Sequence, residues 1–130
     1  MIFHIARREE WERAQLRRAY SPQGFEAEGF IHCSTLTQLL TTANRFFLGH
    51  RDLLLLCIDE NRLTAPFRYE AAVPPAGMLS DDARERLFPH LYGELNLDAV
   101  TATMDFPCGA DGKFTMPAQY GAGCVKKSIP

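Results

Sequence analysis

The sequence lacks the features that would place it in several broad classes of protein. Its formal net charge is only −2 over 130 residues, so no excess of positive charge predicts a broad nucleic-acid surface. The apolar run Leu53–Ile58 is too short to cross a bilayer, and the N-terminus has no apolar core typical of a signal peptide. We therefore expect a cytoplasmic protein that does not enter membranes. Its oligomeric state stays open.

Paired cysteines are also missing. The four cysteines form no CxxC pair and have no close spacing with a histidine. Cys33 and Cys57 lie in apolar segments and are expected to be buried free thiols. A disulfide between Cys108 and Cys124 stays open in principle, although a reducing cytoplasm disfavours it.

The histidines show no ligand-type spacing either, so no metal site is predicted. Their convergence in the fold on a metal ion remains an alternative. His50, beside Gly49 at a predicted helix end, is interpreted as a helix cap. The four are His4, His32, His50 and His90.

Length and composition predict one domain. A chain of 130 residues of which 46% are hydrophobic has enough apolar side chains for a normal core. We expect a single α+β domain over residues 1–106. From Pro107 onward Gly, Pro, Ala and Lys dominate, which predicts a loosely ordered tail over 107–130.

The N-terminal half alternates between predicted strands and helices. Ile2–Ala6 alternates as a strand, and 8–20 reads as a helix stopped by Ser21-Pro22. Residues 23–28 are a predicted loop. A second helix follows Thr35, which with Gln38 fits a capping box. Its apolar side recurs at helical spacing in Leu36, Leu39, Leu40, Ala43 and Phe47.

The second half is predicted to be rich in strands. Leu53–Ile58 is expected to be covered on both faces, and 67–72 alternates with Glu70 on the polar face. A helical turn over 81–87, capped by Ser80, precedes an irregular loop over 88–95. The last predicted strand is 99–106, with its apolar side chains facing inward: Val100, Ala102, Met104 and Phe106.

The segment 29–34 is the most informative stretch of the chain. Alternation in an extended segment turns Ile31 and Cys33 to one side and Phe30, His32 and Ser34 to the other. His32 then lies just before a helix, where backbone N–H groups and the positive end of the helix dipole favour an anion. The pattern fits equally a structural histidine bonded to neighbouring backbone.

Six short motifs carry a family resemblance. They are Ile2-Phe3-His4-Ile5 with Trp11, Glu28 to Ser34, Ala43-Asn44-Arg45-Phe46, Leu54-Leu55-Leu56 with Ile58-Asp59, Glu70, and Phe88 to Gly93. Together they resemble the bacterial family called domain of unknown function 952, over roughly residues 2 to 106. That family is similar in fold to the ADP-ribosyltransferase superfamily. The order of motifs also resembles that of RNA 2′-phosphotransferases and rifampin ADP-ribosyltransferases.

The resemblance implies a fold and a site. The fold would be ADP-ribosyltransferase-like, with split antiparallel sheets, two helices of the N-terminal half packed on them and a cleft for NAD as substrate. His32, Glu70 and His90 are the candidate catalytic residues. The candidate residues for binding NAD are His4, Phe30, Ser34 and Tyr92.

Breaking the bond between nicotinamide and ribose passes through a cationic state, which a carboxylate stabilises. Glu70 fits that role, but an exposed glutamate on a sheet edge also explains it. Glu94 is a poor candidate, since the related family more often carries proline there.

Three functional hypotheses result. The first is a small nucleotide-handling protein that transfers an ADP-ribosyl or phosphoryl group. The second is a binding module of the same fold without catalysis. The third is a metal-dependent hydrolase built on the histidines.

Overall fold

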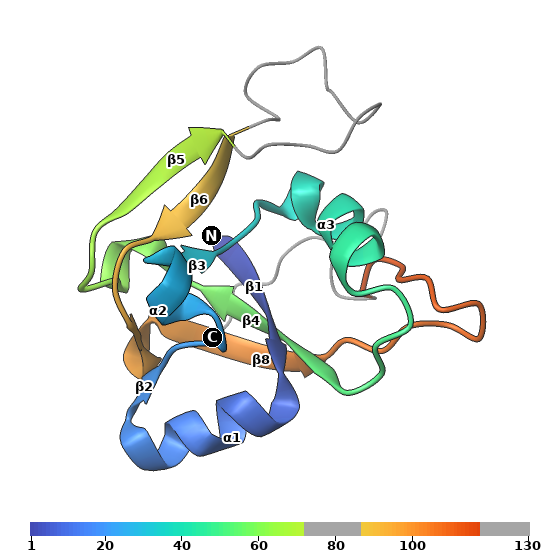
Figure 1. The fold of residues 1–130 in the computed structure, drawn as a ribbon, viewed down its shortest axis with the longest axis horizontal. Coiled ribbons are helices and arrows are strands. Elements are labelled where there is room, and N and C mark those ends of the chain that lie inside the picture. Colours follow the sequence, from blue (N-terminus) through green and yellow to red (C-terminus); the bar gives the residue numbers. More distant parts are fainter. Residues whose placement is uncertain (72–86, 118–130) are drawn as a thin grey trace.

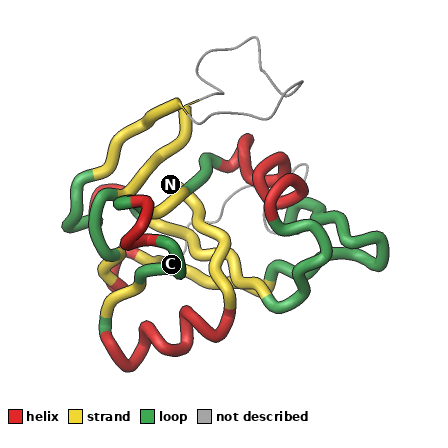
Figure 2. The backbone as a smooth tube through the Cα atoms, in the orientation of Figure 1, coloured by secondary structure: helices red, strands yellow, loops and turns green. Residues whose placement is uncertain are grey.

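A computed structural model describes residues 1–71 and 87–117 as an α+β fold with antiparallel sheets (Figure 1; Figure 2). The predicted helical turn over 81–87 lies outside the described residues, apart from Leu87. Among the described residues, no helix is both long and apolar enough to span a membrane. The α+β class expected from the sequence is confirmed.

The central sheet has the order β1-β4-β8, and all its pairs are antiparallel. All six residues of β4 are buried, which confirms the prediction that this apolar run is covered on both faces. A register shift at Cys57/Ile58 interrupts the pairing with β8. The three strands are β1 (Ile2–Arg7), β4 (Leu53–Ile58) and β8 (Val100–Asp105).

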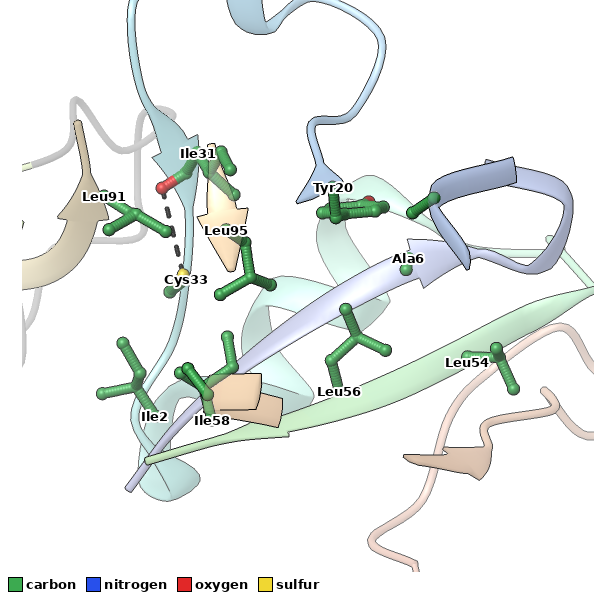
Figure 3. Close-up of a cluster of buried hydrophobic side chains, with 12 residues drawn as sticks. Ile2, Ala6, Tyr20, Ile31, Cys33, Leu54, Leu56, Ile58, Leu91 and Leu95 are labelled. Carbon is green, nitrogen blue, oxygen red and sulfur yellow. Dashed lines mark hydrogen bonds between the residues drawn. The ribbon is translucent and has the colours of Figure 1, made fainter. Parts of the chain in front are cut away.

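Two hydrophobic clusters cover the two faces of this sheet. Because side chains alternate along β1, Ile2 and Ala6 enter one cluster and Phe3 and Ile5 the other. The first cluster includes Ala14 from α1 (Arg8–Arg17), and Figure 3 shows its buried side chains. The second includes Leu39 and Ala43 from α3 (Leu39–Phe46). The two helices therefore lie on opposite faces of the central sheet.

Two smaller sheets complete the fold. The two-stranded sheet pairs β2 (Ala19–Tyr20) with β7 (Leu95–Asn96). The three-stranded sheet has the order β3-β6-β5, and it positions the site described below. Its strands are β3 (Ile31–His32), β6 (Leu87–Leu91) and β5 (Phe67–Ala71).

The helices differ in detail from the sequence predictions. α1 ends at Arg17 rather than at Tyr20, because Arg18 takes a left-handed conformation with φ 67° and the chain continues as β2. The predicted loop over 23–28 contains the one-turn helix α2 (Phe25–Glu28). The capping box of Thr35 and Gln38 is present. It opens a 3₁₀ turn, η1 (Leu36–Gln38), that leads into α3.

The later elements also require corrections. The first half of the predicted loop over 88–95 belongs to strand β6, and its last residue begins β7. Short 3₁₀ turns precede β5 and β8. In β8 the register shift places Val100 against the first cluster and Met104 against the second. Ala102, opposite Cys57, is exposed rather than buried. The turns are η2 (Glu60–Arg62) and η4 (Leu97–Ala99).

The described part of the predicted tail packs on the core. Cys108 and Phe114 are buried in the second cluster, and Phe114 stacks on Phe106 at 4.9 Å between ring centroids. The amide of Asn44 in α3 bonds both backbone polar groups of Phe114. Residues 107–117 are therefore more tightly held than their composition suggests.

Candidate functional site

One face of the β3-β6-β5 sheet gathers most of the predicted site residues. The strand register pairs His32 with His90 and His90 with Arg68, so these three side chains form a row across the sheet. Directly paired residues share a face. The neighbouring row, Ile31, Leu91 and Phe67, belongs to the first hydrophobic cluster. The face that carries the histidines is therefore the one turned away from the core.

Aromatic rings cover this row. The ring of Phe30 stacks on His90, with 4.1 Å between centroids and 22° between planes. It also lies 4.8 Å from the ring of His32 and 5.4 Å from that of Tyr92. The two imidazoles are 5.5 Å apart in an edge-to-face arrangement. Phe30, His32, His90 and Tyr92 form one cluster, which we call the aromatic face.

Glu70 joins the aromatic face through two hydrogen bonds to one oxygen. His90 Nδ1 donates to Glu70 Oε1 at 2.8 Å, and the Tyr92 hydroxyl donates to the same atom. These bonds, that of Tyr92 first and that of His90 second, lower the pKa of Glu70 and keep it ionised. The bond to Glu70 in turn raises the pKa of Tyr92. Oε2 of Glu70 makes no hydrogen bond to the described residues.

His90 has one nitrogen in use and one without a partner. An ionised carboxylate only accepts, so Nδ1 carries the proton that binds Glu70, and Nε2 of the neutral ring is an acceptor. Nε2 is buried and has no hydrogen-bond partner among the described residues, and the residue is 5% exposed. A buried polar atom without a partner is rare and points to a functional role.

The second histidine is held in the same way but at the surface. His32 Nε2 bonds Glu28 Oε1 at 2.8 Å, and both side chains are more than half exposed. The pair links the last residue of α2 to the last residue of β3. Glu28 was missed by the sequence reasoning as a site residue. Its position four residues before His32 in a tight turn is the signal that could have identified it.

Arg68 is the other residue that sequence reasoning missed. Its guanidinium lies over the Tyr92 ring at 5.6 Å from the centroid, which is a cation–π contact. Among the described residues, no carboxylate forms an ion pair with Arg68. Its place directly opposite His90 follows from strand register, which no local pattern in the sequence reveals.

His4 lies behind the site rather than in it. Its Nδ1 donates to the backbone oxygen of His32 at 2.6 Å, and its Nε2 accepts from the hydroxyl of Tyr20 at 2.8 Å. Burial lowers the pKa of His4 to about 4. The predicted ligand-binding role requires an accessible ring, so the geometry corrects it to a structural one: His4 holds β3 in place from the core side.

Ser34 is also turned away from the aromatic face. The residue is buried, its hydroxyl donates to Thr42 Oγ1 at 3.3 Å, and its backbone bridges to Phe3 in β1. Alternation predicted that Ser34 shares the face of His32. That prediction fails because strand β3 ends at His32 and the chain turns toward the central sheet.

The remaining sequence predictions about side chains are settled by their contacts. Glu94 bonds Arg17 at 2.5 Å, so of the two glutamates considered from the sequence as the catalytic acid only Glu70 bonds to the aromatic face. Cys33, Cys57 and Cys108 are buried, as expected for the first two, and none of them forms a disulfide among the described residues, which exclude Cys124. Burial raises the pKa of Cys33 to about 12. His50 Nδ1 bonds the oxygen of Phe47 just past the end of α3, which confirms its interpretation as a cap.

Among the described residues, neither a metal cluster nor the groove beside α1 coincides with the aromatic face. Among residues 1–71 and 87–117, no three His, Cys, Asp or Glu side chains group as metal ligands would. A groove of about 770 Å³ lies between α1 and the segment 21–27. Its wall includes Glu10, Arg13 and Gln23 but no residue of the aromatic face.

Comparisons with known proteins show where the chain has relatives. Residues 5–103 match the model of a family described as "Protein of unknown function (DUF952)". Two crystal structures of protein CC0527 from Caulobacter crescentus, one of them a double mutant, are similar at 31% and 30% identity. Each covers 88% of this chain and 92% of the other, with a TM-score of 0.73.

A solution NMR structure of CC0527 agrees with the crystal structures. It matches at 31% identity and a TM-score of 0.68, and covers 86% of this chain and 89% of the other. No curated protein matches the sequence. The comparisons thus support the α+β fold and leave its activity to be argued from the residues of the site.

Proposed function

The chain belongs to the DUF952 family of proteins of unknown function, and we propose that it binds an NAD-like nucleotide on the aromatic face and transfers its ADP-ribosyl group. The observation that carries this proposal is the ionised Glu70, held by His90 and Tyr92 among the stacked rings. Aromatic rings offer a surface for the nicotinamide or adenine ring. A carboxylate beside them meets the main chemical requirement of the reaction.

In this reaction the bond between C1′ of the ribose and the nicotinamide nitrogen breaks. The nicotinamide leaves with the bonding electrons, and positive charge develops on the ribose. An ionised carboxylate placed beside that charge stabilises the transition state more than the ground state. Glu70 supplies it, since its Oε2 has no partner among the described residues. The acceptor then bonds to C1′ and releases its proton.

The ribose hydroxyls would be bound by His32 and His90. His32 Nδ1 and His90 Nε2 have no hydrogen-bond partner among the described residues, and both can accept from a hydroxyl. His4 and Ser34 are left out of this role because both are buried and bonded elsewhere. Phe30 and Tyr92 supply the rings for stacking.

We include the finer fold class in the proposal. A split arrangement of two three-stranded antiparallel sheets, with helices of the N-terminal half on the central one, is compatible with an ADP-ribosyltransferase-like fold. In that arrangement the aromatic face lies on the β3-β6-β5 sheet, not on the central sheet. Fold resemblance alone does not carry an activity, so the proposal depends on Glu70 and its partners.

The test is release of nicotinamide from NAD, measured by chromatography. We expect the wild-type chain to release nicotinamide and Glu70→Gln to do so about 100-fold more slowly, the usual loss when an electrostatic stabiliser is removed. Glu94→Gln is the matched control and should keep the wild-type rate, because Glu94 pairs with Arg17 instead. A wild-type chain without activity, or equal rates in both variants, would contradict the proposed transfer.

Binding without catalysis is the second candidate, and the covered state of His90 favours it. With Phe30 stacked on its ring and only 5% exposed, His90 is poorly placed to meet a substrate in this conformation. A binding module should gain thermal stability from NAD or ADP-ribose without turnover. Stabilisation lost in Phe30→Ala, with no nicotinamide released, would select this candidate over transfer.

A further inference from the structure

The row of side chains across the β3-β6-β5 sheet can carry out acid–base chemistry that NAD cleavage does not need. His32, His90 and Arg68 are direct cross-strand neighbours, so two imidazoles and a guanidinium face the same side within one row. In ADP-ribosyl transfer Glu70 would supply the charge, and the two histidines would only bind hydroxyls. Two histidines side by side fit a reaction that moves two protons.

Hydrogen bonds to carboxylates hold the two imidazoles in opposite tautomers. Glu70 binds Nδ1 of His90, which leaves Nε2, and Glu28 binds Nε2 of His32, which leaves Nδ1. Each carboxylate fixes the orientation of its ring, as the acid partner does in a catalytic dyad. The two remaining nitrogens have no partner among the described residues, and the ring centroids are 5.5 Å apart. Two oriented imidazoles at this distance can reach one reacting group.

Arg68 adds the charge that the reacting group would need. Its guanidinium stays on the same face, over Tyr92, with no ion pair to a carboxylate among the described residues. A fork of N–H donors matches the oxygens of a phosphate. A phosphoester is therefore the substrate class that suits two proton-transfer groups and one guanidinium.

We propose that the aromatic face hydrolyses a phosphodiester of a nucleotide, with His90 as general base and His32 as general acid. This inference rests on the nucleotide ligand of the proposed function but not on cleavage of NAD. His90 Nε2 takes a proton from water while the water oxygen bonds to phosphorus. The bond from phosphorus to the leaving oxygen breaks, and that oxygen takes the Nδ1 proton of a doubly protonated His32, whose second proton stays on Nε2 against Glu28. Solvent then restores both imidazoles.

Burial explains the assignment of the two roles. While Phe30 is stacked on His90, a proton on Nε2 would be buried without an acceptor. Nε2 of His90 is therefore unprotonated before the reaction and can act as the base. His32 is more than half exposed and exchanges its proton with solvent. Access to His90 requires Phe30 to turn off its ring. Phe30 follows Gly29, whose φ of +87° is a conformation that favours glycine.

The experiment measures hydrolysis of bis(4-nitrophenyl) phosphate and of adenosine 2′,3′-cyclic phosphate by the full chain in the presence of EDTA. The wild type should hydrolyse at least one probe with a bell-shaped pH profile. His32→Asn should lose about 100-fold in kcat on the cyclic phosphate, whose alkoxide leaving group needs a proton, and should change less on the nitrophenyl ester, whose phenolate leaves without one. Arg68→Gln should act chiefly on KM. His50→Asn, prepared identically, should retain the wild-type rate because His50 bonds Phe47 at the end of α3 and is not part of the aromatic face.

His32 is exposed, so its variant is expected to fold, and circular dichroism would verify this. If the wild type hydrolyses neither probe, or if His32→Asn retains the full rate on the cyclic phosphate, the inference is overturned. Binding of ADP-ribose and release of nicotinamide are measured on the same preparations. Retained ADP-ribose binding without phosphodiester hydrolysis would overturn this inference alone and leave the proposed function standing.

Discussion

The free energy of unfolding is expected to fall by about 3 kcal/mol as the pH drops from 6.5 to 4, because of His4 alone. Burial lowers the pKa of His4 from 6.5 to about 4 in the folded chain. Between these values the unfolded chain binds a proton that the folded chain does not. Stability from this group is therefore complete above pH 6.5, declines as the pH falls through the window, and changes no further below about 4.

The cause is visible in the contacts of the ring. Nδ1 of neutral His4 donates to the backbone oxygen of His32, and Nε2 accepts from Tyr20. A second proton on Nε2 would face the hydroxyl oxygen in a site with almost no solvent, so the charge would be poorly compensated. Folding and protonation of His4 thus compete.

Urea unfolding of wild type and His4→Gln at a series of pH values checks this prediction. Glutamine does not titrate, so the variant should lose most of the fall between pH 6.5 and 4, whatever its stability at neutral pH. His50→Gln is the control and should keep the fall. Below pH 4.5, loss of the ionised form of Glu70, whose pKa is lowered, destabilises both chains alike. Parallel pH curves for wild type and His4→Gln would refute the prediction.

The second large effect is expected at Gly93, next to the aromatic face. Gly93 has a φ of +154°, and a Cβ built there would lie 2.6 Å from Cβ of Ala65. That contact is far below van der Waals distance, and the neighbouring methyl group has no rotamer to change. Gly93→Ala should therefore lower the free energy of unfolding by about 3 kcal/mol, combining backbone strain with overpacking.

Gly24→Ala separates the two contributions. Gly24 also has a positive φ, +93°, but a Cβ there would meet no atom within 4 Å. It should cost only the strain of the backbone, about 1 kcal/mol. Equal losses in the two variants would contradict the packing argument. Gly93→Ala should also disturb Tyr92, whose backbone N–H bonds the oxygen of Pro66 beside Ala65.

Local patterns in the sequence correctly predicted several elements of the fold. The alternation of β1, the apolar run of β4 and the capping box at Thr35 are all present as predicted. Each depends on residues close in sequence. The family resemblance likewise depends on short motifs and is confirmed by the match over residues 5–103.

Predictions that depended on pairing between distant strands were less successful. His90 appeared to lie in a loop because Pro89 and Gly93 interrupt the pattern, although β6 pairs with strands on both sides. The register that places Arg68 beside His90 has no local signal. Ser34 and His4 were assigned to the site from alternation and motif order, whereas tertiary contacts turn both into the core.

The central claim is that the aromatic face around Glu70 is the site of a nucleotide. The most direct measurement is titration of the isotope-labelled chain with ADP-ribose, up to about 1 mM, followed by NMR of the backbone amides. The account predicts shifts concentrated at Phe30, His32, Glu70, His90 and Tyr92 that are abolished in Phe30→Ala. Shifts confined to the groove beside α1, or no shifts at all, would contradict it.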